Sequence, residues 1–135
     1  MLIVDANVLL DVVNNDAHWA EWSAQQLRNQ SQLHELLINP VIYTELSMAF
    51  ADLDDVERAV DHMRLKFTEF PKPALYLAGK AFVKYRRAGG LRTSVLPDFL
   101  IGAHAAILNC AILTRDERRY RSYYPRVPLI TPTLQ

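Results

Sequence analysis

The sequence predicts an α/β protein in which a short, mainly parallel central sheet is covered by helices on both faces. Apolar segments of a few residues alternate along the chain with longer segments whose apolar residues recur at helical spacing. Continuous apolar runs are typical of parallel strands buried on both faces, with helices as the crossover connections. The 135 residues suit one domain, and we find no domain boundary within 1–135.

Four segments are predicted strands because each is a short apolar run between helical segments or turns: residues 2–4, 36–38, 110–113 and 127–130. Helices are expected between them, the first two over residues 7–13 and 18–29. Asn39-Pro40 predicts the start of the next helix, because Asn caps a helix and Pro fits its first turn. That helix is expected to run to about residue 51.

The middle of the chain predicts a helical hairpin. One set of apolar residues recurs at helical spacing between residues 56 and 67, and a second set between 75 and 85. Pro71 and Pro73 separate the two sets, and Gly89-Gly90 ends the second. Residues 97–109 then form a predicted helix that is apolar on nearly every side and therefore central. A short helix is expected within 114–124.

Composition excludes several classes of protein. Fifteen basic residues offset fifteen acidic ones, so net charge indicates no polyanionic partner. The single cysteine, Cys110, forms no internal disulfide and suits a reducing compartment. The first residues lack the basic region of a signal peptide, and no stretch approaches the ~20 apolar residues of a membrane helix. We therefore expect a soluble cytoplasmic protein with no membrane partner.

Three aspartates stand at positions where a parallel sheet binds ligands. Asp5 ends the first predicted strand, Asp116 follows the strand at 110–113, and Asp98 lies in the first turn of the central helix. Ligands of open parallel sheets bind at the carboxyl ends of the strands, where Asp5 and Asp116 are both expected. Each aspartate taken alone is better explained as a helix cap or first-turn acid, and Thr114 to Glu117 also fit a capping box.

Glu45 interrupts the apolar surface of the helix that begins at Pro40. A carboxylate on such a surface costs free energy unless it is paired or binds a cation, although it also fits an exposed helix rim. Acids that converge on one partly buried edge repel one another, and a divalent cation relieves that repulsion. Oxygen ligands alone favour Mg²⁺ or Mn²⁺, the ions that assist hydrolysis of phosphodiesters.

Four stretches together resemble the PIN-domain ribonucleases, and most closely the VapC toxins of toxin–antitoxin pairs: LIVDANVLLDVV, NPVIYTELSMAF, LPDFLIGAHAAI and ILTRDERRYRSYYPRVPLITP. The resemblance covers essentially the whole chain and implies a three-layer α/β/α PIN-like fold. Carried over position by position, it implies an acidic quartet that binds Mg²⁺ or Mn²⁺ and catalyses cleavage: Asp5, Glu45, Asp98 and Asp116. It also matches two supporting polar positions, Asn7 and Thr114.

The same resemblance implies a metal-dependent endoribonuclease that acts as the toxin of a VapBC-type pair. It implies an RNA substrate, a cognate VapB-like antitoxin and a toxin homodimer. The alternative is a non-catalytic PIN-like module that binds RNA or a protein. Arg115 and Arg119 are candidate RNA-binding residues because arginine binds phosphates and both lie close to Asp116, although a solvated amphipathic helix explains each of them slightly better.

Other carboxylate-dependent folds fit less well. The haloacid-dehalogenase phosphatases need a second aspartate two positions after the first, where this chain has Asn7. A receiver domain needs paired acids near the end of the first strand and a later lysine on a strand, which we do not find. A dinucleotide-binding fold is disfavoured because the sequence contains no G-x-G-x-x-G motif.

Overall fold

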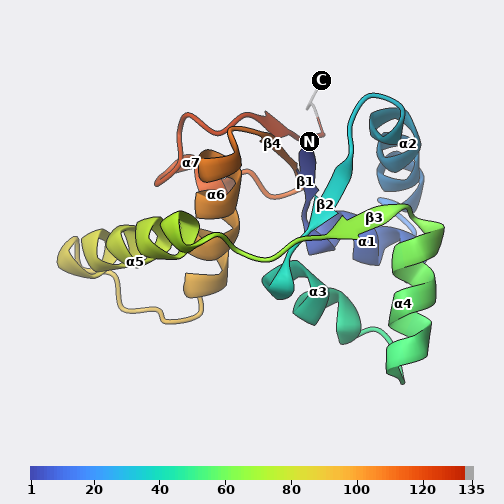
Figure 1. Ribbon diagram of the computed structural model, residues 1–135, viewed down its shortest axis with the longest axis horizontal. Helices are drawn as coiled ribbons and strands as arrows, with labels where there is room; N and C mark the ends of the chain where they lie inside the picture. Colours follow the sequence, from blue (N-terminus) through green and yellow to red (C-terminus); the bar gives the residue numbers. More distant parts are fainter. Residues whose placement is uncertain (133–135) are drawn as a thin grey trace.

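The computed structural model describes residues 1–132 and has a five-stranded parallel sheet at its centre (Figure 1). The strands are β1 (Leu2–Val4), β2 (Leu36–Ile38), β3 (Leu65–Phe67), β4 (Ala111–Leu113) and β5 (Leu129–Ile130). The helices are α1 (Ala6–Val13), α2 (Ala20–Ser31), α3 (Pro40–Ser47), α4 (Leu53–His62), α5 (Lys72–Arg87), α6 (Leu96–Leu108) and α7 (Arg118–Arg121). The predicted α/β class with a parallel sheet is confirmed.

The order of the strands across the sheet is β3-β2-β1-β4-β5. The chain steps outward from β1 to β2 and β3, then returns across the sheet to β4 and β5. Because crossover connections between parallel strands are right-handed, this reversal puts α1–α4 on one face and α5–α7 on the other. Figure 1 shows α5, α6 and α7 on the left of the sheet and α2 and α4 on its right. The structure therefore has the expected three layers.

The core is built on the strands and on α6. Leu2, Ile3 and Val4 are fully buried, as expected for a strand covered by helices on both faces. Helix α6 packs against α5, α3 and α7, which explains why it is apolar on nearly every side. Among residues 1–132, no helix combines the length and the apolar character required to cross a bilayer.

The predicted helical hairpin is wrong at one point, because a strand lies between its two helices. Helix α4 ends at His62, and Arg64 adopts a left-handed backbone conformation with φ 58°. Leu65–Phe67 then pair with β2 at the edge of the sheet as β3. Apolar residues at this spacing fit a continued helix or a turn followed by a strand. The backbone pairing with β2 stabilises the turn and strand over the continued helix. Helix α5 then packs on α6 and not on α4.

The helix predicted to start at Asn39-Pro40 forms as α3. Asn39 is its N-cap, and the side-chain Oδ1 accepts a hydrogen bond from the backbone N–H of Ile42 over 3.0 Å. Pro40 occupies the first turn, where the absence of a backbone N–H costs nothing. This start positions Glu45, five residues after Pro40, near Asp5 at the end of β1.

Candidate active site

The predicted acidic residues lie at the point where the strand order reverses. β1 and β4 are adjacent parallel strands with Val4 opposite Leu113, and the backbone N–H of Asp5 donates to Leu113 O over 2.9 Å. Their connections leave the sheet towards opposite faces, so the two chain segments diverge beyond this point. Such a reversal is where open α/β sheets bind ligands.

Asp5 is completely buried and accepts four hydrogen bonds. Its Oδ1 accepts from the backbone N–H of Ala6 over 2.8 Å and from Arg119 Nη1 over 2.7 Å. Its Oδ2 accepts from the hydroxyl of Thr114 over 2.8 Å and from the hydroxyl of Tyr120 over 2.7 Å. A carboxylate has about four lone-pair positions, so the fold satisfies all of them. The charge at the end of β1 is thus specifically accommodated.

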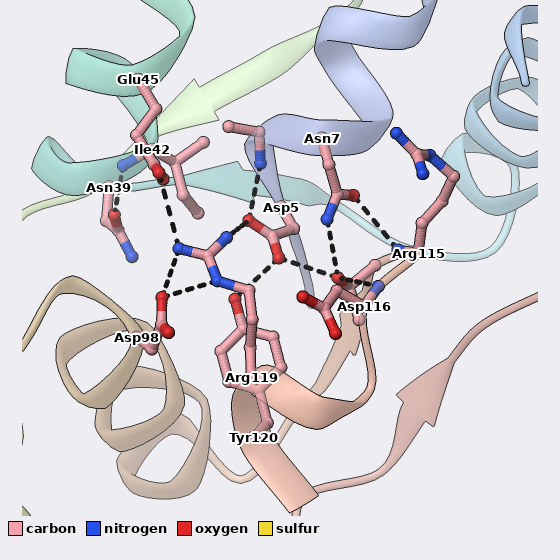
Figure 2. A network of polar contacts seen from close by, with 12 residues as sticks. Asp5, Asn7, Asn39, Ile42, Glu45, Asp98, Arg115, Asp116, Arg119 and Tyr120 are labelled. Carbon is pink, nitrogen blue, oxygen red and sulfur yellow. Dashed lines mark hydrogen bonds and ion pairs between the residues drawn. The ribbon is translucent and has the colours of Figure 1, made fainter. Parts of the chain in front are cut away.

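The guanidinium of Arg119 joins three of the four predicted acids (Figure 2). Besides its contact with Asp5, Nε donates to Asp98 Oδ1 over 2.6 Å, and Nη2 lies 2.5 Å from the same oxygen. Nη2 also lies 3.5 Å from Glu45 Oε2. Burial by itself lowers the pKa of Arg119, but the negative charges of Asp5 and Asp98 outweigh burial and raise it. Arg119 therefore remains a cation at the centre of the cluster.

Glu45 and Asp98 are half-buried acids whose charge is only partly compensated. Burial raises the pKa of each carboxyl, and the positive charge of Arg119 opposes that rise. Glu45 Oε1 is a buried oxygen with no hydrogen-bond partner among residues 1–132. A buried oxygen left unpaired costs roughly 1–3 kcal/mol, so this atom requires an explanation. The negative charges of Asp5 and Asp98 also help to raise the pKa of Glu45, so the three carboxylates lie near one another.

Asp116 lies at the exposed rim of the cluster. Its backbone N–H donates to Thr114 Oγ1 over 3.0 Å, and its Oδ1 accepts from the backbone N–H of Arg118 over 3.1 Å. The second bond closes a turn just before α7, whose N-cap is Glu117 without a side-chain cap, so the capping box predicted over Thr114 to Glu117 does not form. The negative charge of Asp116 also reaches Asp98, where it helps raise the pKa of that carboxyl. Asp116 therefore stabilises the turn before α7 and lies near Asp98.

Asn7 and Thr114 connect β1 with the segment after β4. Asn7 Nδ2 donates to Thr114 Oγ1 over 3.2 Å, and Asn7 Oδ1 accepts from the backbone N–H of Arg115 over 3.1 Å. Figure 2 shows Asn7 above the segment that carries Asp116, with Asp5 to the left of that segment. These bonds hold the Asp116 segment against the start of α1. Both predicted supporting residues thus lie in contact with the acidic cluster or with its neighbouring chain.

The two arginines predicted to bind RNA are engaged with carboxylates. Arg115 Nε and Nη2 donate to the two oxygens of Asp11 over 2.6 and 2.9 Å, and its guanidinium lies 5.1 Å from the ring of Trp19. Asp11 is 3% exposed and also accepts from Ser23 Oγ over 2.7 Å. Arg119 holds the acids as described above. In this arrangement both guanidinium groups already have anionic partners, and RNA binding by them stays a prediction.

Sequence reasoning missed two residues that hold this region, Asp11 and Tyr120. Asp11 interrupts an apolar helix run as Glu45 does, so the same reasoning about a buried carboxylate applies to it. Tyr120 stands among arginines and carries no signal in the sequence, yet only 1% of it is exposed. Burial, followed by the negative charge of Asp5, raises the pKa of Tyr120. Its hydroxyl therefore stays protonated and donates a hydrogen bond to Asp5 Oδ2.

A cleft of about 320 Å³ opens beside the acids. Its lining includes Asp98, Asp116, Arg118, Arg119 and Ser122. Acidic side chains therefore adjoin basic and hydroxyl groups in one open depression. Such a mixture suits an anionic ligand that is held by the basic groups next to the carboxylates.

The donor set fits a hard divalent cation, although the side chains are arranged around Arg119. Within residues 1–132, no three His, Cys, Asp or Glu side chains are positioned to hold a metal ion together. The candidate ligands are nevertheless all carboxylate oxygens, the type that Mg²⁺ and Mn²⁺ prefer. Glu45 Oε1 is in addition buried without a partner. The residues present thus fit such an ion in chemistry, once the guanidinium gives up its contacts.

Comparisons with known proteins agree with this fold. The family model of the PIN domain matches residues 2–124. A search of curated proteins returned no match. Among solved structures, the chain is similar to one from VapBC2 of Rickettsia felis bound to a promoter DNA fragment, with a TM-score of 0.74 and 16% identity over 96% of this chain and 97% of that chain.

Two further solved structures have the same fold. A chain of VapBC-1 from nontypeable Haemophilus influenzae has a TM-score of 0.72 and 14% identity, with 96% of both chains covered. A chain of DNA-bound VapBC from Salmonella typhimurium has a TM-score of 0.68 and 17% identity, with 96% of both chains covered. At these identities the structures establish a common fold. Because the family model spans nearly all of the sequence, this chain belongs to the PIN domain family.

Proposed function

We propose that this chain is a metal-dependent endoribonuclease and the toxin of a VapBC-type toxin–antitoxin pair. One observation carries the proposal: Asp5, Glu45 and Asp98, from three separate elements, converge on one point at the reversal of strand order. Membership of the PIN domain family, whose members are generally nucleases, supports hydrolysis of a nucleic acid. The similar folds in VapBC complexes support a VapB-like antitoxin as the partner.

In the proposed reaction, Asp5, Glu45, Asp98 and Asp116 would hold Mg²⁺ or Mn²⁺. The bound ion would supply positive charge at the scissile phosphate and acidify a water molecule. Glu45 Oε1 would orient the attacking water, because it is buried and has no hydrogen-bond partner among residues 1–132. Thr114 and Tyr120 hold Asp5 in a fixed orientation by donating to its Oδ2. Arg118 and Ser122 border the cleft in which the phosphodiester would lie.

Attack by water in line with the leaving oxygen needs no RNA 2′-hydroxyl as the nucleophile. The expected products are therefore a 5′-phosphate and a 3′-hydroxyl. The toxin is expected to act in the cytoplasm and to form a homodimer, both of which stay predictions. The rival function is a PIN-like module that binds RNA or a protein without cutting.

The test is an incubation of the purified chain with total cellular RNA in Mg²⁺, in Mn²⁺ and in EDTA. We expect cleavage with either ion and none in EDTA, with 5′-phosphate ends found when the products are mapped. The Asp5→Asn variant, purified in parallel, excludes a contaminating nuclease. Binding of RNA without cleavage under all conditions would favour the non-catalytic module. Rescue of growth by coexpression with the protein of a short neighbouring reading frame would identify the antitoxin.

A further inference from the structure

Arg119 occupies the position that a cation would take among the acids. Its guanidinium contacts carboxylates from the end of β1, from α3 and from the first turn of α6. In Figure 2 Asp5, Glu45 and Asp98 surround this group on three sides. Only 15% of the side chain is exposed, so the charge is held largely out of water. A cation in such a place must be strongly stabilised by its anionic neighbours.

Asp5 has no lone pair left for a second cation. Of its four donors, the backbone of Ala6, the hydroxyl of Thr114 and the hydroxyl of buried Tyr120 belong to fixed parts of the fold. Arg119 is the remaining donor, and it stands at the end of a long side chain that also lines the open cleft. Any ion that binds Asp5 Oδ1 must therefore take the place of the guanidinium.

The neutralisation that Arg119 provides is incomplete. A single positive charge faces three carboxylates, and the contact with Glu45 Oε2 is long, at 3.5 Å. Glu45 Oε1 is left without any partner among residues 1–132. A dication placed among the same oxygens would compensate twice the charge. Electrostatics therefore favours exchange of the guanidinium for a dication when one is present at sufficient concentration.

We infer that Arg119 is an internal counter-ion that holds the acidic cluster in the metal-free protein and is displaced when a divalent cation binds. This inference rests on the proposed function only in taking the cluster as the dication site. The guanidinium and the ion compete for the same carboxylate oxygens. The apparent association constant for the ion then equals the intrinsic constant multiplied by the fraction of molecules in which Arg119 has left the site. Removal of the guanidinium removes this competition.

The competition can be measured by titrating the purified protein with Mn²⁺ and determining the concentration of free Mn²⁺ by electron paramagnetic resonance. In Arg119→Met the unbranched stem is kept and the charge is lost. The matched control is Arg121→Met, which makes the same change on the same helix, where the side chain is half exposed and pairs with Glu117 over 3.4 Å. We expect Arg119→Met to bind Mn²⁺ about tenfold or more tightly than the wild type, and the control to stay within about twofold.

Equal or weaker Mn²⁺ binding by a folded Arg119→Met variant would overturn the inference, and so would absence of Mn²⁺ binding by all three proteins. If Arg119→Met does not fold, the wild type supplies the answer. The Nε–H signal of Arg119 in a ¹⁵N spectrum is expected to be protected from exchange in EDTA and to lose that protection in saturating Mg²⁺. Retained protection in Mg²⁺ would overturn the inference.

Cleavage of RNA by the same preparations separates this inference from the proposed function. Tighter Mn²⁺ binding by Arg119→Met without RNA cleavage by the wild type would support the counter-ion and contradict the nuclease. RNA cleavage by the wild type with unchanged Mn²⁺ affinity in Arg119→Met would support the nuclease and contradict the counter-ion.

Discussion

Thr114 donates its hydroxyl hydrogen to Asp5 Oδ2 over 2.8 Å and thereby joins the ends of β4 and β1. The two residues are 109 positions apart in the chain. Thr114 Oγ1 in turn accepts from Asn7 Nδ2 and from the backbone N–H of Asp116. One hydroxyl therefore links the buried acid of the site to the segment that carries the exposed acid. Substitutions at this junction are expected to affect both stability and activity.

Asp5→Asn is expected to abolish RNA cleavage and to lower the free energy of unfolding by about 2 kcal/mol. An amide placed at Asp5 keeps one acceptor for Ala6 and Arg119, but its NH₂ group then faces the hydroxyls of Thr114 and Tyr120, which both lose their acceptor. The protein should remain folded at 25 °C, because domains of this size have several kcal/mol of stability. Urea unfolding and RNA cleavage measure the two effects.

Exposed Asp61 supplies the control for Asp5, since Asp61→Asn makes the same chemical change at the surface of α4. It should preserve cleavage and stability. RNA cleavage at the wild-type rate by a folded Asp5→Asn variant would show that Asp5 takes no part in the reaction.

Glu45→Gln is expected to leave the free energy of unfolding within about 0.5 kcal/mol of the wild type, or to raise it. Burial already disfavours the charge of Glu45, and its contact with Arg119 is long, so loss of the charge costs little in the metal-free protein. Mn²⁺ affinity should fall about tenfold or more, because an amide oxygen is a weaker ligand than a carboxylate. Calorimetric titration with Mn²⁺ and thermal unfolding in EDTA separate these roles.

Glu69 is exposed, and Glu69→Gln is the matched substitution outside the cluster. It should change neither the free energy of unfolding nor the Mn²⁺ affinity. A purely structural Glu45 would show the opposite pattern, with a loss of stability and unchanged Mn²⁺ binding.

Arg115→Ala is expected to lower the free energy of unfolding by about 2–4 kcal/mol. The substitution leaves Asp11, which is 3% exposed, with a single hydrogen bond from Ser23. Arg58→Ala removes an exposed partner of Asp55 in α4 and should cost less than about 1 kcal/mol. Urea unfolding of the two variants makes the comparison. Similar losses in both would show that the Arg115–Asp11 pair is no stronger than a surface pair.

Gly102→Ala is expected to destabilise the protein by about 1–3 kcal/mol, whereas Gly79→Ala should stabilise it by about 0.5–1 kcal/mol. A Cβ atom at Gly102 in α6 would overlap the ring of Tyr124, whose hydroxyl is held by Phe99 O over 2.9 Å. A Cβ atom at Gly79 in α5 meets no atom of residues 1–132 within 4 Å outside its own helix turn, so only the higher helix propensity of alanine acts there. Thermal unfolding of both variants should show shifts of opposite sign, and a shift of the same sign would contradict this packing.

Local patterns in the sequence were sufficient to predict most of the fold. The strands β1, β2, β4 and β5, the cap at Asn39 and the central place of α6 follow from short apolar runs, capping residues and helical spacing. The placement of Asp5 at the carboxyl edge also follows, because a residue directly after a parallel strand stands there whatever the rest of the chain does. These features depend on neighbours within a few residues.

Two features were decided only by the tertiary structure. β3 is three residues long and becomes a strand because β2 offers an open edge to it. Arg119 is one of several arginines in its segment, and its partners Asp98, Glu45 and Asp5 are 21, 74 and 114 positions away. Its closeness to Asp116 in the sequence made it a candidate for RNA binding, but no local pattern predicts its contacts with these three carboxylates. Its role depends on which guanidinium the packed helices bring to the buried carboxylates, and long-range packing alone determines that distance.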